Sequence, residues 1–127
     1  MKLHEQRATH LNTVTGYGPG YIEINRVRHG GNVIVAAASV QNWSVAGFEL
    51  LKPQDFEPVL GLEPELVLLG TGRRHRFADP HWTAYLARAG IALEAMDTGA
   101  ACRTYNILMS DGRRVVAALL QQQETDR

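Results

Sequence analysis

The chain has 127 residues, with 13 basic and 13 acidic side chains and a formal net charge of zero. A chain of this length is typical of one domain and buries roughly two-thirds of the surface that its unfolded form exposes, which is enough for a proper core. Because the charges cancel, the sequence lacks the basic footprint of nucleic-acid-binding or membrane-surface proteins. The single cysteine, Cys102, excludes an intrachain disulfide and fits a reducing compartment.

The N-terminal stretch MKLHEQRATH lacks the apolar core of a signal peptide. No apolar run approaches the roughly 20 residues that a membrane-spanning helix needs. We therefore expect a soluble, cytoplasmic protein that forms one domain over residues 1–127 and has no integral membrane segment. Residues 1–12 are polar and unpatterned, and we expect them to be mobile unless a sheet holds them.

The first third of the chain has the alternation of antiparallel strands. Residues 13–17 are predicted to form a strand, and the glycine-rich residues 16–20 a turn after it. Residues 21–27 alternate apolar and polar side chains, and the polar residues 29–32 separate them from the apolar run 33–38. This spacing predicts that the two runs pair as an antiparallel hairpin.

The middle of the chain has weaker patterns. Residues 41–51 are interpreted as a bend and a short strand. Pro53 suits the first position of a helix, and Pro58 predicts that this helix is short or bent, because proline removes an interior hydrogen bond. Residues 66–69 form a compact apolar run that predicts a buried strand.

The clearest helix signal follows Asp79. Asp79 is a good N-cap, Pro80 suits the first helical position, and Gly90 suits the end. The apolar stripe between them has helical spacing and consists of Trp82, Tyr85, Leu86 and Ala89.

The last third of the chain predicts a strand, a capped helix, a turn and a second strand. Residues 91–96 alternate as a strand, and Asp97 or Thr98 can accept hydrogen bonds from the free N–H groups of the next helical turn. Residues 111–112 end the helix, and the apolar run 115–120 is short enough to be a buried strand. Strand–helix–strand units return the chain parallel to itself. The fold class is therefore α/β: a single domain with a central mixed β-sheet, helices packed on it, and an N-terminal antiparallel hairpin.

A candidate site lies where two of these strands end. Ligands of open α/β sheets bind beyond the carboxyl ends of parallel strands. If strands 66–69 and 91–96 are neighbours, basic side chains face a helix N-terminus, whose dipole and free N–H groups favour an anion. The predicted anion or partner surface consists of Gly70, Thr71, Gly72, Arg73, Arg74, Asp97, Thr98, Arg103 and Asn106. The alternative is that the arginines are solvated or form exposed ion pairs with Asp79, Glu94 or Asp97, each contributing only about 0–1 kcal/mol.

The sequence gives little support for a nucleotide-binding, metal-binding or catalytic site. Position 75 is histidine rather than the third glycine of a dinucleotide-binding loop, and there is no phosphate-binding Gly-Lys-Ser/Thr. The five histidines lack the spacing of ligand pairs, so we predict no metal and no cofactor. Cys102 stands near a predicted helix start, which can lower a thiol pKa, but it also lies on the apolar stripe of that helix, where cysteine commonly just packs. We assign no catalytic residue and regard an enzyme as the less favoured reading.

Two stretches carry a family resemblance. VLLGTGRRHRF (67–77) and GIALEAMDTGAACRTYNILMSDGRRVVAALL (90–120) resemble the Mth938-like family, small bacterial and archaeal proteins of unassigned function related to mitochondrial complex I assembly factor three. The resemblance spans roughly residues 10–120 and implies an α/β domain with a central mixed sheet. For the mitochondrial relative it implies assembly of respiratory complex I through protein contacts.

We therefore expect a non-enzymatic interaction or assembly factor, for respiratory or other membrane complexes, with a protein partner and no nucleic acid. The alternative is a protein or enzyme that binds a small anion with the Arg73/Arg74 and Asp97/Thr98 loops.

Overall fold

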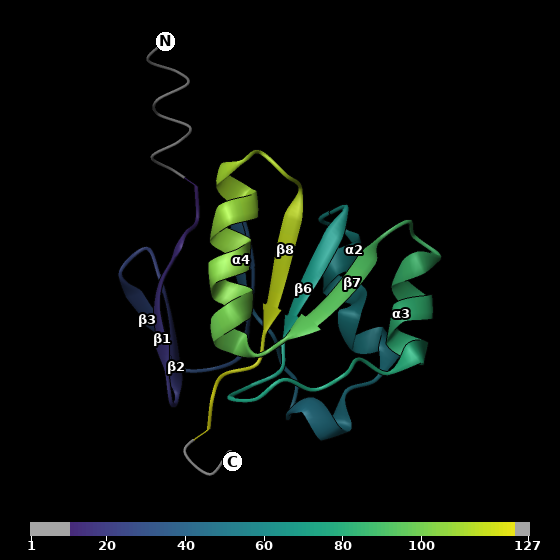
Figure 1. Ribbon diagram of the computed structural model, residues 1–127, viewed down its shortest axis with the longest axis horizontal. Helices are drawn as coiled ribbons and strands as arrows, with labels where there is room; N and C mark the ends of the chain where they lie inside the picture. The colour runs from purple at the N-terminus through teal and green to yellow at the C-terminus, as the bar shows by residue number, and fades with distance from the viewer. Residues whose placement is uncertain (1–10, 124–127) are drawn as a thin grey trace.

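The computed structural model describes residues 11–123 (Figure 1). The strands are β1 (Val14–Gly18), β2 (Tyr21–Ile24), β3 (Val27–His29), β4 (Val33–Ala36), β5 (Ser39–Asn42), β6 (Leu66–Gly70), β7 (Ala92–Met96) and β8 (Val115–Leu119). The helices are the 3₁₀ helices η1 (Phe48–Leu50) and η2 (Pro53–Phe56) and the α-helices α2 (Glu57–Leu60), α3 (Pro80–Ala87) and α4 (Thr98–Ser110).

The central sheet is mixed, as predicted. Its strand order is β5-β4-β8-β6-β7. β6 runs parallel to both β7 and β8, whereas β4 is antiparallel to β8 and to β5. The predicted fold class is thereby confirmed, with the parallel strands supplied by the second half of the chain.

Both faces of this sheet are buried, which explains the continuous apolar sequence of β8. Residues 115, 117 and 119 of β8 pack in a cluster with α4 and the first two strands, and residues 116 and 118 pack in a second cluster with η2, α2 and α3. Figure 1 shows α4 across one face of the sheet and α3 beside β7. The segments that follow β6, β7 and β8 lie at the end of the sheet where these three strands stop.

The N-terminal strands form a separate three-stranded antiparallel sheet in the order β1-β2-β3, and it lies beside α4 (Figure 1). The hairpin predicted between residues 21–27 and 33–38 is wrong. The first run breaks at Asn25 and Arg26, whose φ angles of 52° and 69° make a tight turn, so β2 pairs with β1 and β3. The second run pairs instead with β5 and β8.

Most of the remaining elements follow their local signals. The short strand expected within residues 41–51 is wrong: β5 begins earlier, at Ser39, and ends at Asn42, and residues 48–50 form η1 instead. Pro53 occupies the first turn of η2, and the Asp79 carboxylate caps α3 by accepting from the His81 N–H. The expectation for residues 1–12 lies outside the described residues except at its last two positions, where Asn12 N–H donates to the Ala37 carbonyl oxygen.

Candidate functional site

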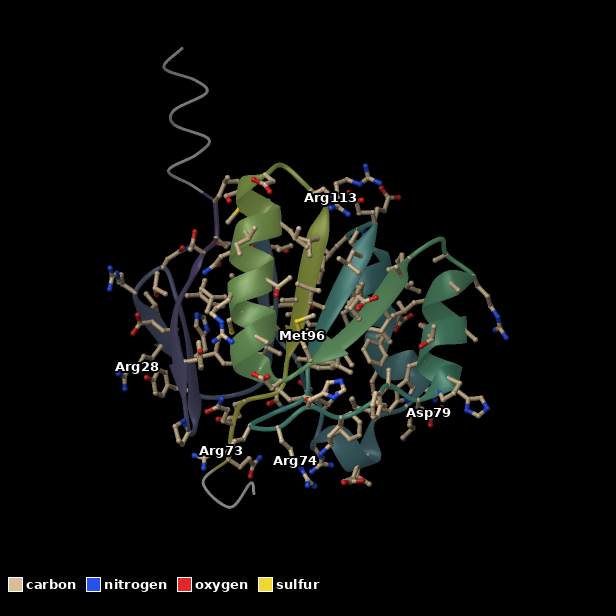
Figure 2. All side chains as sticks on the ribbon, in the orientation of Figure 1. Arg28, Arg73, Arg74, Asp79, Met96 and Arg113 are labelled. Atoms are coloured by element: carbon tan, nitrogen blue, oxygen red, sulfur yellow. The ribbon has the colours of Figure 1, made fainter. Side chains whose placement is uncertain are left out.

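The two loops of the predicted site adjoin, because β6 and β7 are neighbouring parallel strands. Thr71 N–H donates to the Met96 carbonyl oxygen at 2.9 Å, and Thr98 N–H donates to the Gly72 carbonyl oxygen at 2.8 Å. Figure 2 shows Arg73 and Arg74 at the edge of the sheet beyond Met96. The proximity inferred for the loops is therefore observed.

Thr98 joins three segments at this edge. Its side chain is fully buried, and its hydroxyl accepts from Gly72 N–H at 2.8 Å and donates to the Leu120 carbonyl oxygen at 2.5 Å. Gly70 is in close contact with it, since a Cβ on Gly70 would lie 2.9 Å from Thr98 Oγ1. The Thr98 hydroxyl thus binds the ends of β6 and β8 to the start of α4.

The other residues of α4 in the predicted set contact the chain itself. The Asp97 carboxylate caps the helix by accepting from Ala100 N–H at 2.9 Å. Asn106 bonds the backbone of Val14 twice, accepting from its N–H at 2.9 Å and donating to its carbonyl oxygen at 2.8 Å. Arg103, on the same side of α4, donates to the hydroxyl of Tyr17. Arg103 and Asn106 therefore contact β1.

Arg73 and Arg74 remain as exposed cations of the predicted set. The buried Thr71 hydroxyl fixes their loop by donating to the Arg74 carbonyl oxygen at 2.7 Å. No ion pair within residues 11–123 includes either arginine. Asp79, proposed as an alternative partner, is instead bonded by His81, whose N–H lowers the pKa of that carboxyl. The two guanidinium groups thus face solvent.

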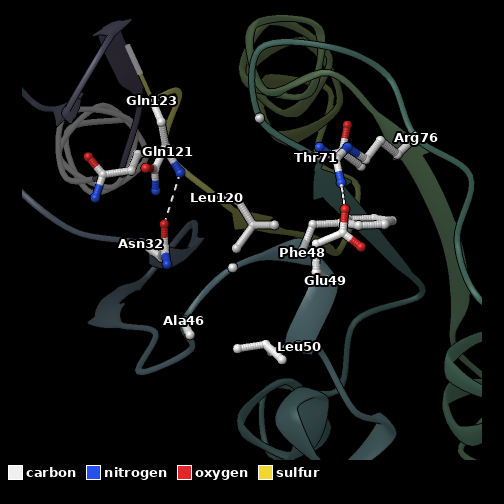
Figure 3. Close-up of a pocket in the computed structure, with 12 residues that line it drawn as sticks. Asn32, Ala46, Phe48, Glu49, Leu50, Thr71, Arg76, Leu120, Gln121 and Gln123 are labelled. Atoms are coloured by element: carbon white, nitrogen blue, oxygen red, sulfur yellow. Dashed lines mark hydrogen bonds and ion pairs between the residues drawn. The ribbon is translucent and has the colours of Figure 1, made fainter. Parts of the chain in front are cut away.

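A pocket of about 250 Å³ opens beside this loop (Figure 3). Its walls include η1, Arg76, the side chain of Leu120, and Gln121, whose N–H donates to Asn32 Oδ1. Arg76 and Glu49, which both line the pocket, form an ion pair (Figure 3). The sequence reasoning missed this pocket because residues 41–51 gave no clear pattern. The signal available was the position of Arg76 in the basic run that follows β6.

The surroundings of Cys102 do not support a reactive thiol at this position. Cys102 is buried in the cluster beneath α4, and this burial raises the pKa of its thiol from 9.0 to about 12. A thiol with such a pKa is almost entirely protonated at neutral pH and is a poor nucleophile. Burial likewise raises the pKa of Tyr105, which donates to the Asn12 carbonyl oxygen. Within residues 11–123, no cluster of three or more His, Cys, Asp or Glu side chains could hold a metal ion.

Comparison with known proteins identifies the family. Residues 14–120 match the model of the family described as "Protein of unknown function (DUF498/DUF598)", so the chain belongs to this family. A crystal structure of a protein from Bordetella parapertussis is 47% identical, with a TM-score of 0.84, and the match covers 91% of this chain and 99% of that one. A solution structure of a Bordetella pertussis protein, described as a Mth938-like domain, is 38% identical, with a TM-score of 0.80, over 91% of this chain and 89% of that one. The resemblance to the Mth938-like family is thereby confirmed.

Two curated relatives differ in whether their names state a function. The chain is 33% identical to the Bos taurus protein "NADH dehydrogenase [ubiquinone] 1 alpha subcomplex assembly factor 3", over 84% of this chain and 59% of that protein. It therefore spans little more than half the length of that relative. An uncharacterized protein from Rhodobacter capsulatus is 35% identical over 84% of this chain and 82% of its own length. The family thus contains members named as complex I assembly factors and members with no named function.

A link to membranes comes from the name of a related structure. A Bartonella henselae structure that is 26% identical over 89% of this chain and 97% of its own, with a TM-score of 0.81, is called an outer membrane protein. In the described part of this chain, no helix is both long and apolar enough to cross a membrane.

Proposed function

We propose that this protein is a non-enzymatic interaction factor that helps assemble a larger protein complex, respiratory or otherwise membrane-bound, from the cytoplasmic side. The observation that carries the proposal is the loop after β6, which presents two exposed arginines on a fixed backbone. The relative named as an assembly factor for NADH dehydrogenase supports the class of function.

Exposed large apolar side chains on this loop and on η1 also suit a protein partner. Phe77, on the same loop, is 84% exposed, and Leu50, at the end of η1, is 66% exposed. Arginine and aromatic side chains are enriched at protein interfaces, because they combine apolar area with hydrogen-bond donors. An exposed phenylalanine contributes little to the free protein, whereas covering it in a complex contributes apolar burial.

The alternative function, binding of a small anion by the Arg73/Arg74 and Asp97/Thr98 loops, uses the same arginines. Thr98 Oγ1 already donates one hydrogen bond and accepts another, and the Asp97 carboxylate caps α4. An anion would therefore be held mainly by Arg73 and Arg74. If this alternative is right, inorganic phosphate raises the melting temperature of the wild type and not that of the Arg73→Ala/Arg74→Ala variant.

The test of the assembly function is affinity purification from gently solubilised cells, followed by mass spectrometry. The wild type is compared with Arg73→Ala/Arg74→Ala and with the control Arg88→Ala, which removes an exposed arginine at the end of α3. We expect subunits of one membrane complex with the wild type and the control, and their loss with the double variant. Recovery of the same set with all three proteins, or of no specific subunit with any, would refute the proposed surface.

A further inference from the structure

The pocket beside η1 contains a guanidinium group that is largely covered by the protein. The Arg76 side chain is 23% exposed, and its Cζ lies 5.1 Å from the centroid of the Phe48 ring, in the range of cation–π contacts. Its Nε is buried and has no hydrogen-bond partner within the part of the chain that the structure describes. An unpaired buried donor is costly, so this site favours an additional acceptor.

The carboxylate that now contacts Arg76 is easily exchanged. Glu49 bonds one terminal nitrogen of Arg76, and its side chain is 79% exposed. An ion pair with so exposed a partner is worth little, because water solvates the carboxylate nearly as well. The Arg76 side chain is thus mostly covered by the protein, whereas the carboxylate that it binds is mostly exposed and can leave at small cost.

The rest of the pocket is suited to a short apolar body. The side chains of Leu120, Leu50 and Ala46 line the pocket between Arg76 and the amides of Gln121 and Asn32 (Figure 3). Its volume of about 250 Å³ is below the usual range for drug-sized ligands, roughly 300–1,000 Å³. This combination fits a small molecule with one carboxylate and a short hydrocarbon chain.

We infer that this pocket binds a small amphipathic monocarboxylate, whose carboxylate replaces that of Glu49 on Arg76 and whose hydrocarbon part lies on Leu120 and Leu50. The inference does not rest on the proposed assembly function, because it uses neither Arg73 nor Arg74; the two share only the exposed side chain of Leu50. Binding would change the surroundings of η1, since Glu49 and Leu50 belong to it.

The test titrates acetate, butyrate and hexanoate into ¹⁵N-labelled protein and follows amide chemical shifts, with butanol and butyramide as uncharged controls. We expect shifts at Phe48, Gly72 and Gln121 with the acids only. Affinity should rise by up to about fourfold for each added methylene group until the pocket is full. Equal binding of the uncharged controls, or shifts spread away from these amides, would overturn the inference.

Two substitutions probe the exchange of carboxylates. Glu49→Gln removes the competing charge, and we expect butyrate to bind about threefold more tightly. Arg76→Met keeps an apolar stem and should weaken butyrate at least roughly tenfold. The matched control is Glu57→Gln, which neutralises an exposed carboxylate at the start of α2 and should leave affinity unchanged. Because Glu49→Gln alters an exposed residue, unchanged or weaker binding in that variant refutes the exchange even if Arg76→Met does not fold.

Discussion

Replacing Thr98 with valine keeps the shape of the side chain and removes its hydroxyl group. In the structure this hydroxyl accepts from Gly72 N–H and donates to the Leu120 carbonyl oxygen. No other hydrogen bond to the Leu120 oxygen is found among the described residues. Thr98→Val therefore leaves one donor and one acceptor without a partner next to a fully buried side chain.

The size of the effect follows from these two groups. Each unsatisfied buried group costs about 1–3 kcal/mol, and the added methyl group returns about 0.8 kcal/mol through apolar burial. The net loss is about 1–5 kcal/mol of a total stability that for domains of this kind is roughly 5–15 kcal/mol. We expect the melting temperature to fall by roughly 10 °C.

The measurement is urea unfolding followed by circular dichroism, with Thr98→Ser as the control. Serine keeps the hydroxyl and loses one methyl group, so it should cost only about 1 kcal/mol. If valine is tolerated as well as serine, the hydroxyl does not hold the ends of β6 and β8, and the structural role assigned to Thr98 is refuted.

Three further predictions concern the packing around α4. Gly70→Ala should lower the free energy of unfolding by about 1–3 kcal/mol in urea, because a Cβ at this position would lie 2.9 and 3.0 Å from neighbouring atoms. The control Gly61→Ala, where a Cβ would meet nothing within 4 Å, should be neutral or slightly stabilising. Equal effects of the two substitutions would contradict this. Asn106→Ala should cost about 2–3 kcal/mol by removing both bonds to β1, and fast exchange of the β1 amides in that variant would report their release. The Cys102 thiol should resist a thiol-specific reagent at pH 8 until the protein unfolds. The free energy of unfolding should fall between about pH 9 and 12, because the thiol of the unfolded chain loses its proton at lower pH than the buried thiol does. Urea unfolding at alkaline pH should show a smaller fall of stability with pH for Cys102→Ser than for the wild type.

Local sequence signals predicted the second half of the fold well. Asp79 and Pro80 define the start of α3, Asp97 caps α4, and Gly112 adopts a φ of 83° after its end. These signals act within one helical turn, so they can be read without knowledge of the fold. The adjacency of the two loops also followed, because parallel strands linked by a helix commonly lie in the same sheet.

The parts that sequence reasoning missed depend on contacts between distant residues. Asn106 has the position of a solvent-facing helical residue, yet it bonds Val14, 92 positions earlier in the chain. The alternation of residues 21–27 continues through the turn at Asn25 and Arg26, so it concealed the division into β2 and β3. Arg76 and Glu49 are 27 residues apart, and neither lies in a periodic element that would have brought them together.

The position of β8 has a consequence for how the chain is made. β5 and β4 form one pair and β6 and β7 another, and β8 alone connects them by bonding β4 on one side and β6 on the other. During synthesis on the ribosome, both pairs of strands emerge before β8, which joins them. Until β8 emerges, each pair has an unpaired strand edge. The central sheet therefore closes only after residues 115–119 have been released, so arrest of translation shortly before this point would leave an aggregation-prone chain rather than a smaller folded unit.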